Sequence, residues 1–232
     1  MNAESWKIKA ATEAAKLVRD DMVIGLGSGT TVAKIITTIS ELGSIATFVA
    51  SSSSSQKLAE KCGLNLSSLD VHPKLDMTID GADEVDSNFD MIKGRGGAHT
   101  REKILVSATK KLVIVVDRTK LVKSLGHRFP VPVEVLPFAP KYTMRMLAGL
   151  GKPTLRTLAG DIPMITDNGN YLVDLKFRKI SNVAYLEQHI NTLPGVIDNG
   201  LFAGVADVVL VGYEGGCKVL RDKKSFLTFL NR

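Results

Sequence analysis

Short apolar runs alternate with stretches of helical periodicity along the first half of the chain. Apolar runs predict buried strands at Met22–Ile24, Ile45–Ala50, Leu75–Ile79 and Leu112–Val116. Apolar residues at helical spacing predict helices at Glu4–Val18, Thr31–Ile39, Gln56–Lys61 and Thr100–Lys110. The serines at 51–55 are interpreted as a solvated loop and helix N-cap. Because strands that alternate with helices favour parallel pairing, we expect an α/β fold with a doubly wound, mostly parallel sheet.

The pattern changes after Gly126. Phe129–Pro137 is an apolar run interrupted by prolines, which favour an edge strand or a domain junction. The Asn168-Gly169 pair is typical of a hairpin turn. Further strands are predicted at Thr154–Thr157 and Tyr171–Phe177, and helices at Lys141–Leu150 and Val183–Ile190.

These elements predict a second, smaller α+β domain with an antiparallel sheet over 128–205. Buried-strand patterns at Ala206–Gly212 and Lys218–Leu220 predict a return to the large domain. The expected division is therefore 1–127, 128–205 and 206–232.

Composition narrows the class of protein. The chain has 232 residues, of which 44% are hydrophobic and 6% aromatic, and its formal net charge is +6. Lys and Arg are spread beside acids, and one Trp and four Tyr give few aromatic surfaces for stacking on bases, so a phosphorylated small substrate is favoured over nucleic acid.

Three further features bear on location. No apolar run approaches the roughly 20 residues that span a bilayer, so no membrane partner is expected. The first 19 residues mix charges with alanines, unlike a signal or transit peptide. Cys62 and Cys217 lack metal-site spacing and are interpreted as reduced thiols of a cytoplasmic protein.

The first motif, Gly25–Thr31, joins a predicted strand to a predicted helix. Its glycines let the backbone approach a ligand, and the helix N-terminus offers free N–H groups to an anion. No lysine follows the glycines as in a P-loop, and Thr30 stands where a dinucleotide fingerprint needs its third glycine. The motif indicates either binding of a phosphate or sugar hydroxyls, or a tight turn alone.

The second motif is Asp80-Gly81-Ala82-Asp83, which directly follows a predicted strand. A turn at Gly81 would let both carboxylates face one pocket, where they could accept hydrogen bonds from a polyol. The alternative is a pair of surface acids, with Asp83 or Glu84 capping a neighbouring element. A calcium loop is disfavoured because Ala82 interrupts the alternation of oxygen ligands.

The third motif runs from Lys93 to Lys103, with glycines at 94, 96 and 97. Lys93 could stabilise a developing oxyanion. Glu102, in the first turn of the predicted helix, is either a general base or a residue that complements the helix dipole. His99 is interpreted mainly as a polar loop residue.

Together these segments resemble the type A ribose-5-phosphate isomerases. The resemblance rests on Gly25–Thr31, Ile79–Glu84, Met91–Lys103, Phe129–Leu136 and Thr166–Asn170, and it extends through Pro194–Val196 and Gly200–Ala203. It implies an aldose–ketose isomerase of the pentose phosphate pathway that interconverts ribose 5-phosphate and ribulose 5-phosphate without a metal or organic cofactor. It also implies a Rossmann-like domain, a small ferredoxin-like domain and assembly into homodimers or homotetramers.

The resemblance further implies a set of site residues. Glu102 matches the catalytic base, and Lys93, Asp80 and Asp83 are expected to assist the chemistry. The residues expected to bind substrate are Ser28, Gly29, Thr30, Thr31, Asp80, Gly81, Ala82, Asp83, Lys93, Gly94, Arg95, Gly96 and Lys120. Arg95 and His99 depart from the smaller or apolar residues that other members often carry.

Two other classes of function remain open from the sequence. A related sugar-phosphate deaminase or CoA transferase could use a similar scaffold. A non-catalytic sugar-phosphate sensor would bind the same ligand, although such a regulator is expected to carry an added DNA-binding helix pair.

Overall fold

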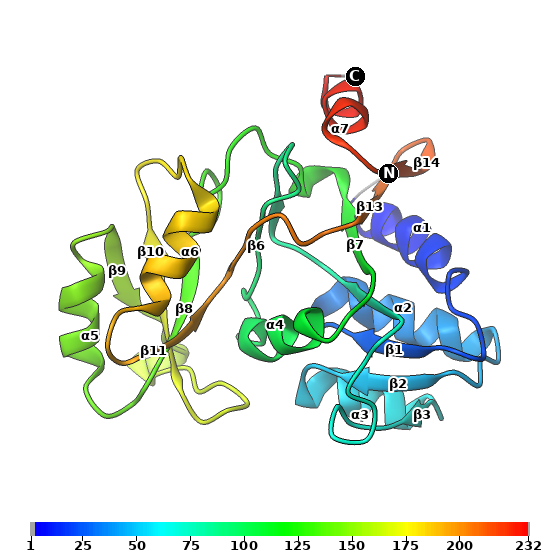
Figure 1. The fold of residues 1–232 in the computed structure, drawn as a ribbon, viewed down its shortest axis with the longest axis horizontal. Helices are drawn as coiled ribbons and strands as arrows, with labels where there is room; N and C mark the ends of the chain where they lie inside the picture. Colours follow the sequence, from blue (N-terminus) through cyan, green and yellow to red (C-terminus); the bar gives the residue numbers. More distant parts are fainter. Residues whose placement is uncertain (1–2, 232) are drawn as a thin grey trace.

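The structure is a computed structural model that describes residues 3–231 (Figure 1). Its largest sheet has seven strands in the order β14-β13-β7-β4-β1-β2-β3. All neighbours pair in parallel except β13 and β14, which are antiparallel at one edge. The strands are β1 (Val23–Leu26), β2 (Thr47–Ala50), β3 (Asn65–Leu66), β4 (Met77–Asp80), β7 (Leu112–Asp117), β13 (Val208–Tyr213) and β14 (Gly216–Leu220).

Helices cover both faces of this sheet, as the strand β7 makes clear. Val113 and Val115 face one core, whereas Leu112, Ile114 and Val116 face the other. The first core includes residues of α1 (Ala3–Ala15), α2 (Gly29–Glu41) and α3 (Ser53–Lys61); α4 (His99–Ser107) and α7 (Lys223–Leu230) contribute to cores on the other face. Because alternate residues of a strand point to opposite faces, a wholly apolar strand requires cover on both sides. The predicted doubly wound α/β sheet is confirmed.

A smaller antiparallel sheet has the order β11-β8-β10-β9. Its strands are β8 (Val131–Val135), β9 (Lys152–Leu155), β10 (Tyr171–Lys176) and β11 (Val196–Asn199), with the helices α5 (Pro140–Leu147) and α6 (Val183–Asn191) between them in sequence. The chain order β8-α5-β9-β10-α6-β11, with this arrangement of strands, is that of a ferredoxin-like unit, so this part of the predicted fold is also confirmed.

The strand predicted from Phe129–Pro137 lies in the sheet interior. Of the two expected positions, an edge strand or a domain junction, the edge is therefore wrong, and the domain junction stays a prediction. β8 pairs with β10 on one side and with β11 on the other. The carbonyl of Pro132 accepts a hydrogen bond from the N–H of Gly200, beyond the end of β11. In an antiparallel pair the N and C=O of one residue point the same way. The N–H that proline lacks would therefore face the Gly200 turn, and no ladder bond to β10 is lost.

Several elements differ from the sequence expectation. The short strands β5 (Glu84–Val85), β6 (Met91–Ile92) and β12 (Leu201–Phe202) form a third sheet, β12-β6-β5, that was not predicted. The strands β3 and β11, the helix α7 and the 3₁₀ turns η1 (Arg118–Lys120) and η2 (Ala159–Asp161) were also not predicted. The serine run is less solvated than expected: Ser52 caps α3, and it is buried together with Ser51 and Ser55.

The domain boundaries at 127/128 and 205/206 stay a prediction. A separate core for the small sheet supports them, since its buried residues lie within 128–205 except for Ile92, Val122 and Leu125. The third sheet joins the two parts, because β12 follows the small sheet in sequence and pairs with β6. In Figure 1, β6 and α4 lie between the two larger sheets.

Candidate active site

A cavity of about 420 Å³ lies where the parallel strands end. It is lined by Lys7, Ser28, Gly29, Thr30, Thr31, Gly81, Ala82, Asp83, Lys93, Gly94, Arg95, Gly96, Glu102 and Lys120. The segments that follow β1, β4, β6 and β7 supply all of these residues except Lys7 and Glu102. Ligands of open α/β sheets bind at this edge, outside the carboxyl ends of the strands.

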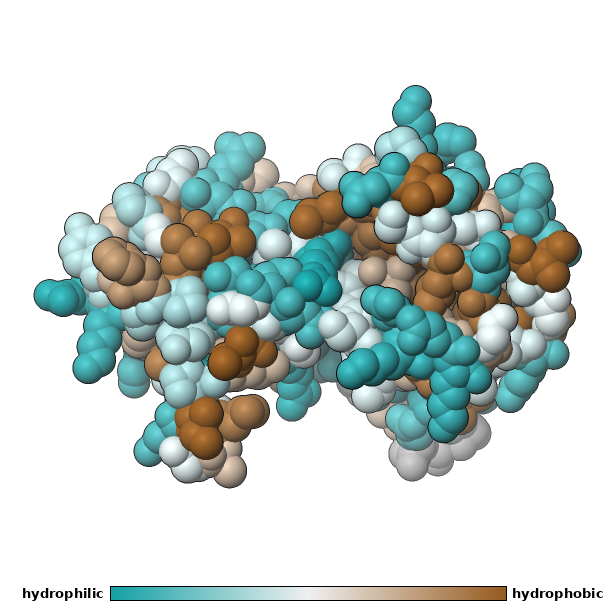
Figure 2. All heavy atoms as spheres, turned by 90° about the horizontal axis from the view of Figure 1, so that it is seen from below, coloured by the Kyte–Doolittle hydropathy of each residue, from teal (hydrophilic) through white to brown (hydrophobic). Residues whose placement is uncertain are grey.

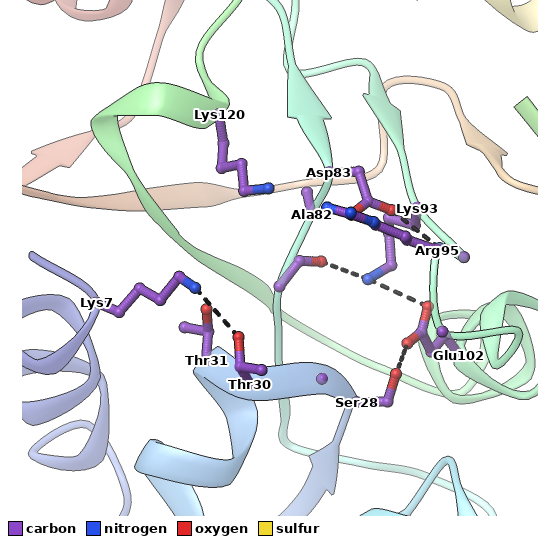
Figure 3. A pocket seen from close by; sticks show the side chains of 14 residues that line it. Lys7, Ser28, Thr30, Thr31, Ala82, Asp83, Lys93, Arg95, Glu102 and Lys120 are labelled. Carbon is purple, nitrogen blue, oxygen red and sulfur yellow. Dashed lines mark hydrogen bonds and ion pairs between the residues drawn. The ribbon is translucent and has the colours of Figure 1, made fainter. Parts of the chain in front are cut away.

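Lys93 lies buried between two carboxylates. Its Nζ is 2.8 Å from Asp80 Oδ2. Figure 3 shows its two other contacts: Nζ is 3.3 Å from Glu102 Oε2 and donates to the carbonyl of Gly81. Lys93 is 2% exposed and Glu102 is 3% exposed. Burial opposes the charge of Lys93, but the Asp80 and Glu102 carboxylates outweigh it and hold the pKa of Lys93 above its usual value.

Asp80 lies behind Lys93 and is absent from the cavity wall. Its Oδ1 accepts hydrogen bonds from the N–H groups of Ser28, at 3.2 Å, and Gly81, at 2.7 Å. A Cβ on Gly27 would lie 1.9 Å from the Asp80 carboxyl group, so only glycine allows this approach. Asp80 is fully buried and contacts Lys93 in place of the cavity, so its expected contact with substrate stays a prediction.

Asp83 does line the cavity. Its N–H donates to the carbonyl of Ile92, and its Oδ2 accepts from the N–H of Arg95 at 3.0 Å. Burial raises the pKa of Asp83 above its usual value. The neighbouring Glu84 is not a surface acid, because it is fully buried. It accepts from the N–H groups of Gly126, Arg128 and Phe129.

The N-terminus of α2 opens on the other side of the cavity. Ser28 occupies the N-cap position but makes no capping bond; its Oγ donates instead to Glu102 Oε1 at 2.5 Å. The first N–H groups of α2 therefore remain available to an anion. Lys7 and Lys120 bring two ammonium groups toward this end, and Lys7 Nζ donates to Thr30 Oγ1 at 3.2 Å (Figure 3).

Lys7 was not predicted as a site residue. It lies among the alanines and the other charged residues of α1, more than twenty positions before Ser28, and it belongs to no motif. Only the packing of α1 against α2 and β13 brings it to the cavity. α1 carries both Lys7 and Lys9, and the sequence cannot distinguish either of them from a solvated surface lysine.

The first turn of α4 is fixed from the small sheet. Thr100 donates to Glu134, and Lys103 Nζ lies 2.9 Å from both Asp198 Oδ1 and Glu187 Oε1. Glu134 is fully buried and also accepts from Thr166, Asn168 and Asn170, the polar residues of the Thr166–Asn170 turn. These contacts set the position of Glu102 between Thr100 and Lys103.

Comparison with known proteins places this geometry in a family. Residues 47–216 match the family model described as ribose 5-phosphate isomerase A (phosphoriboisomerase A). The ribose-5-phosphate isomerase A of Thermomicrobium roseum is 43% identical over 230 residues, which are 97% of each chain. That of Thermosynechococcus vestitus is 48% identical over 216 residues, covering 90% of this chain and 92% of the relative.

The chain belongs to the ribose 5-phosphate isomerase A family. A solved D-ribose-5-phosphate isomerase in complex with phospho-erythronic acid has a TM-score of 0.92 and 43% identity, and it covers 95% of this chain and 100% of its own. The enzyme of Methanocaldococcus jannaschii has a TM-score of 0.90 and 40% identity, with the same coverage. The sensor, deaminase and CoA-transferase alternatives are not favoured.

The predicted substrate-binding residues other than Asp80 all line this one cavity. Their contacts with a ligand and their roles stay predictions. His99 differs from its expectation as a polar loop residue. It is the first residue of α4, is fully buried, lies against Gly94, and has no hydrogen-bond partner for either ring nitrogen within the described residues. Burial lowers the pKa of His99.

Two further negative observations apply to residues 3–231. Across that range, no group of three or more His, Cys, Asp or Glu side chains is arranged to hold a metal ion. No helix in the same part of the chain is long and apolar enough to cross a bilayer.

The proximity of Asp80 and Glu102 predicts a pH dependence of stability. Burial and the Glu102 charge raise the pKa of Asp80 from 3.8 to about 7, although Lys93 opposes the shift. Between these values the folded state binds the proton that the unfolded state has lost. This group therefore makes stability fall as pH rises, with a slope of at most about 1.4 kcal/mol per pH unit. Glu102→Gln removes the repulsion and should flatten the slope.

Unfolding by urea between about pH 5 and pH 7 measures this slope, and carbon NMR of the Asp80 carboxyl reports its pKa directly. Glu41→Gln, on the exposed end of α2, serves as the control and should keep the wild-type slope. Equal slopes for Glu102→Gln and wild type would contradict the coupling between Asp80 and Glu102.

Proposed function

We propose that the chain interconverts D-ribose 5-phosphate and D-ribulose 5-phosphate through an enediolate, with Glu102 as the base that moves a proton between C2 and C1. The observation that carries this assignment is the position of the Glu102 carboxylate. It is buried at the cavity wall, accepts from Ser28 and faces the ammonium group of Lys93. A carboxylate placed in this way can take a proton from a carbon acid and return it without release to water.

The movement of protons and charge in this reaction suggests roles for the groups that surround Glu102. When Glu102 takes the C2 proton of the open-chain aldose, the electron pair forms the enediolate and negative charge develops on its oxygens. Lys93 Nζ, fixed by Asp80, stabilises that charge. Proton transfer from O2 to O1 and return of the Glu102 proton to C1 complete the ketose. Asp83 is placed to accept a hydrogen bond from a sugar hydroxyl, since it lines the cavity.

The phosphate group is assigned to the end of the cavity formed by α2. The free N–H groups at Gly29, Thr30 and Thr31 supply oriented donors, and the helix dipole favours an anion there. Lys7 and Lys120 supply two positive charges. The substrate would then extend from this end to the carboxylate of Glu102.

Replacement of the base tests the function. Glu102→Gln keeps the shape of the side chain but cannot take a proton, so kcat should fall by about 10²–10⁴-fold while binding of ribose 5-phosphate changes little. A coupled assay of ribulose 5-phosphate formation measures kcat, and calorimetric titration measures binding. Glu41→Gln is the matched control, with wild-type values expected for both. Near-normal turnover in Glu102→Gln would show that Glu102 is not the base.

Removal of one cation tests the phosphate end. Lys7→Met should raise the KM for ribose 5-phosphate by about 10- to 100-fold, the value of a hydrogen bond to a charged group, with a smaller effect on kcat. Unphosphorylated D-ribose cannot use this contact, so it should be a poor substrate with the same kcat/KM for the wild type and for Lys7→Met. Lys16→Met removes a lysine that lies in an exposed pair with Glu13 and should leave KM unchanged. A Lys7→Met protein with wild-type KM would place the phosphate elsewhere.

We also propose that the chain forms a homodimer or homotetramer in the cytoplasm. Exposed apolar side chains on the small-sheet half support association: Phe138 is 95% exposed, and Leu158, Ile162 and Ile165 are more than half exposed. Figure 2 shows apolar patches on that half of the molecule, on the left of the view. The two cysteines are free thiols, which agrees with a reducing compartment.

Light scattering tests the association. The wild type should give two or four times the 25.0 kDa of one chain. Phe138→Asp should shift the mass toward a single chain at low micromolar concentration, because a charge would be buried at the contact. Val71→Asp, at another exposed apolar position, is the control. A single-chain mass for the wild type would refute the oligomer.

A further inference from the structure

Arg156 extends from the small sheet to the Lys93–Gly96 loop. It directly follows β9, and its backbone is fixed on two sides. Its N–H donates to the carbonyl of Leu172 at 2.8 Å, and its carbonyl accepts from the N–H of Met164 at 3.0 Å. The side chain therefore starts from a rigid position.

Asp174 of β10 sets the direction of the Arg156 guanidinium. Nε donates to Asp174 Oδ2 at 2.9 Å, and Nη2 donates to the other carboxylate oxygen. This two-point pairing holds the guanidinium plane and leaves Nη1 pointing at the loop. Nη1 donates to the carbonyl oxygens of Gly94, at 3.2 Å, and Arg95, at 2.8 Å. The side chain is 16% exposed.

These two hydrogen bonds fix the orientation of two peptide groups. All peptide bonds of the described chain are trans, so the C=O and N–H of one peptide group point in opposite directions. The carbonyl of Gly94 points to Arg156, and the N–H of the same peptide, on Arg95, donates to Asp83 Oδ2 at 3.0 Å.

In the next peptide group the carbonyl of Arg95 points to Arg156, so the N–H of Gly96 points away from it. Within residues 3–231 that N–H has no acceptor, and Gly96 lines the cavity together with Lys93 and Glu102. The Gly96 N–H is therefore a donor that a bound ligand can use.

The charge of Arg156 adds to its geometric effect. A cation that binds the carbonyl oxygen polarises the peptide and makes its N–H a stronger donor, as in hydrogen-bonded chains. A donor that is already oriented stabilises developing negative charge without reorganisation during the reaction.

We propose that Arg156, oriented by Asp174, is a positioning residue that holds the Arg95–Gly96 peptide with its N–H directed at the negative charge of the reacting sugar. The inference rests on the proposed enediolate mechanism and adds a residue of the small sheet to it. Arg156 is absent from the wall of the cavity and acts through the peptide. Because the Gly96 N–H faces charge that develops during the reaction, loss of Arg156 weakens the transition state more than the ground state.

Arg156→Lys is the decisive variant, because a single ammonium group cannot bind both Asp174 oxygens and both carbonyls. The expected result is a kcat that falls by about 10- to 100-fold, with a KM for ribose 5-phosphate within about twofold of the wild type. Binding of phospho-erythronic acid, whose carboxylate carries full negative charge, should weaken by a factor similar to the loss in kcat. Asp174→Asn keeps the size of the residue at position 174 but weakens its pairing with the Arg156 guanidinium. It should lower kcat and the binding of phospho-erythronic acid as Arg156→Lys does, by a smaller factor.

The control is Arg145→Lys, at an exposed position of α5, for which wild-type kcat, KM and acid binding are expected. A purely structural role of Arg156 would lower the unfolding midpoint but leave kcat per folded chain and acid binding unchanged. That result in both Arg156→Lys and Asp174→Asn would overturn the proposal, and so would a rise in KM at constant kcat.

The wild-type enzyme separates this inference from the function on which it rests. Absence of ribose 5-phosphate turnover in the wild type would overturn the proposed function. The titration of wild type and Arg156→Lys with phospho-erythronic acid would then still decide whether Arg156 presents the loop N–H to an anion, since that readout needs no turnover.

Discussion

The burial of Lys93 between Asp80 and Glu102 is the interaction on which the site depends. A buried ammonium group is tolerated only when carboxylates and hydrogen bonds compensate its lost hydration, and loss of its partners would cost several kcal/mol. Asp80 meets that need from the back, where two backbone N–H groups hold it. Glu102 meets it from the cavity side. The ammonium group of Lys93 therefore stays charged and fixed in orientation, while Glu102, one of its two partners, still faces the cavity.

This arrangement explains why the glycines stand where they do. Gly27 must lack a side chain because Asp80 occupies the space, and Gly94 must lack one because His99 packs against it. A Cβ on Gly200 would meet the carbonyl of Lys93 at 2.1 Å. The glycines of the sequence motifs are thus places where the chain closes around the buried charges, in addition to sites where a ligand approaches the backbone.

The alternation of apolar runs and helices was enough to predict the parallel sheet, because each buried strand is local in sequence. The glycine and acid motifs predicted the cavity wall for the same reason: each is a short segment at a strand end. The position of Asp80 behind Lys93, the interior place of Pro132 and the burial of His99 were not predictable in this way. Each depends on partners far along the chain. Lys7 and Arg156 reach the site only through the packing of α1 and β9, and neither lies within a motif.

The contacts of α4 have a consequence for how the molecule opens. Thr100 and Lys103, on either side of Glu102, are fixed by Glu134, Asp198 and Glu187 from the small-sheet part of the chain. Local opening of a protein proceeds in cooperative units whose members share their contacts. Glu102 and the small sheet therefore belong to one such unit, so the protection of the α4 amides against hydrogen exchange should follow that of β8 and not that of β1.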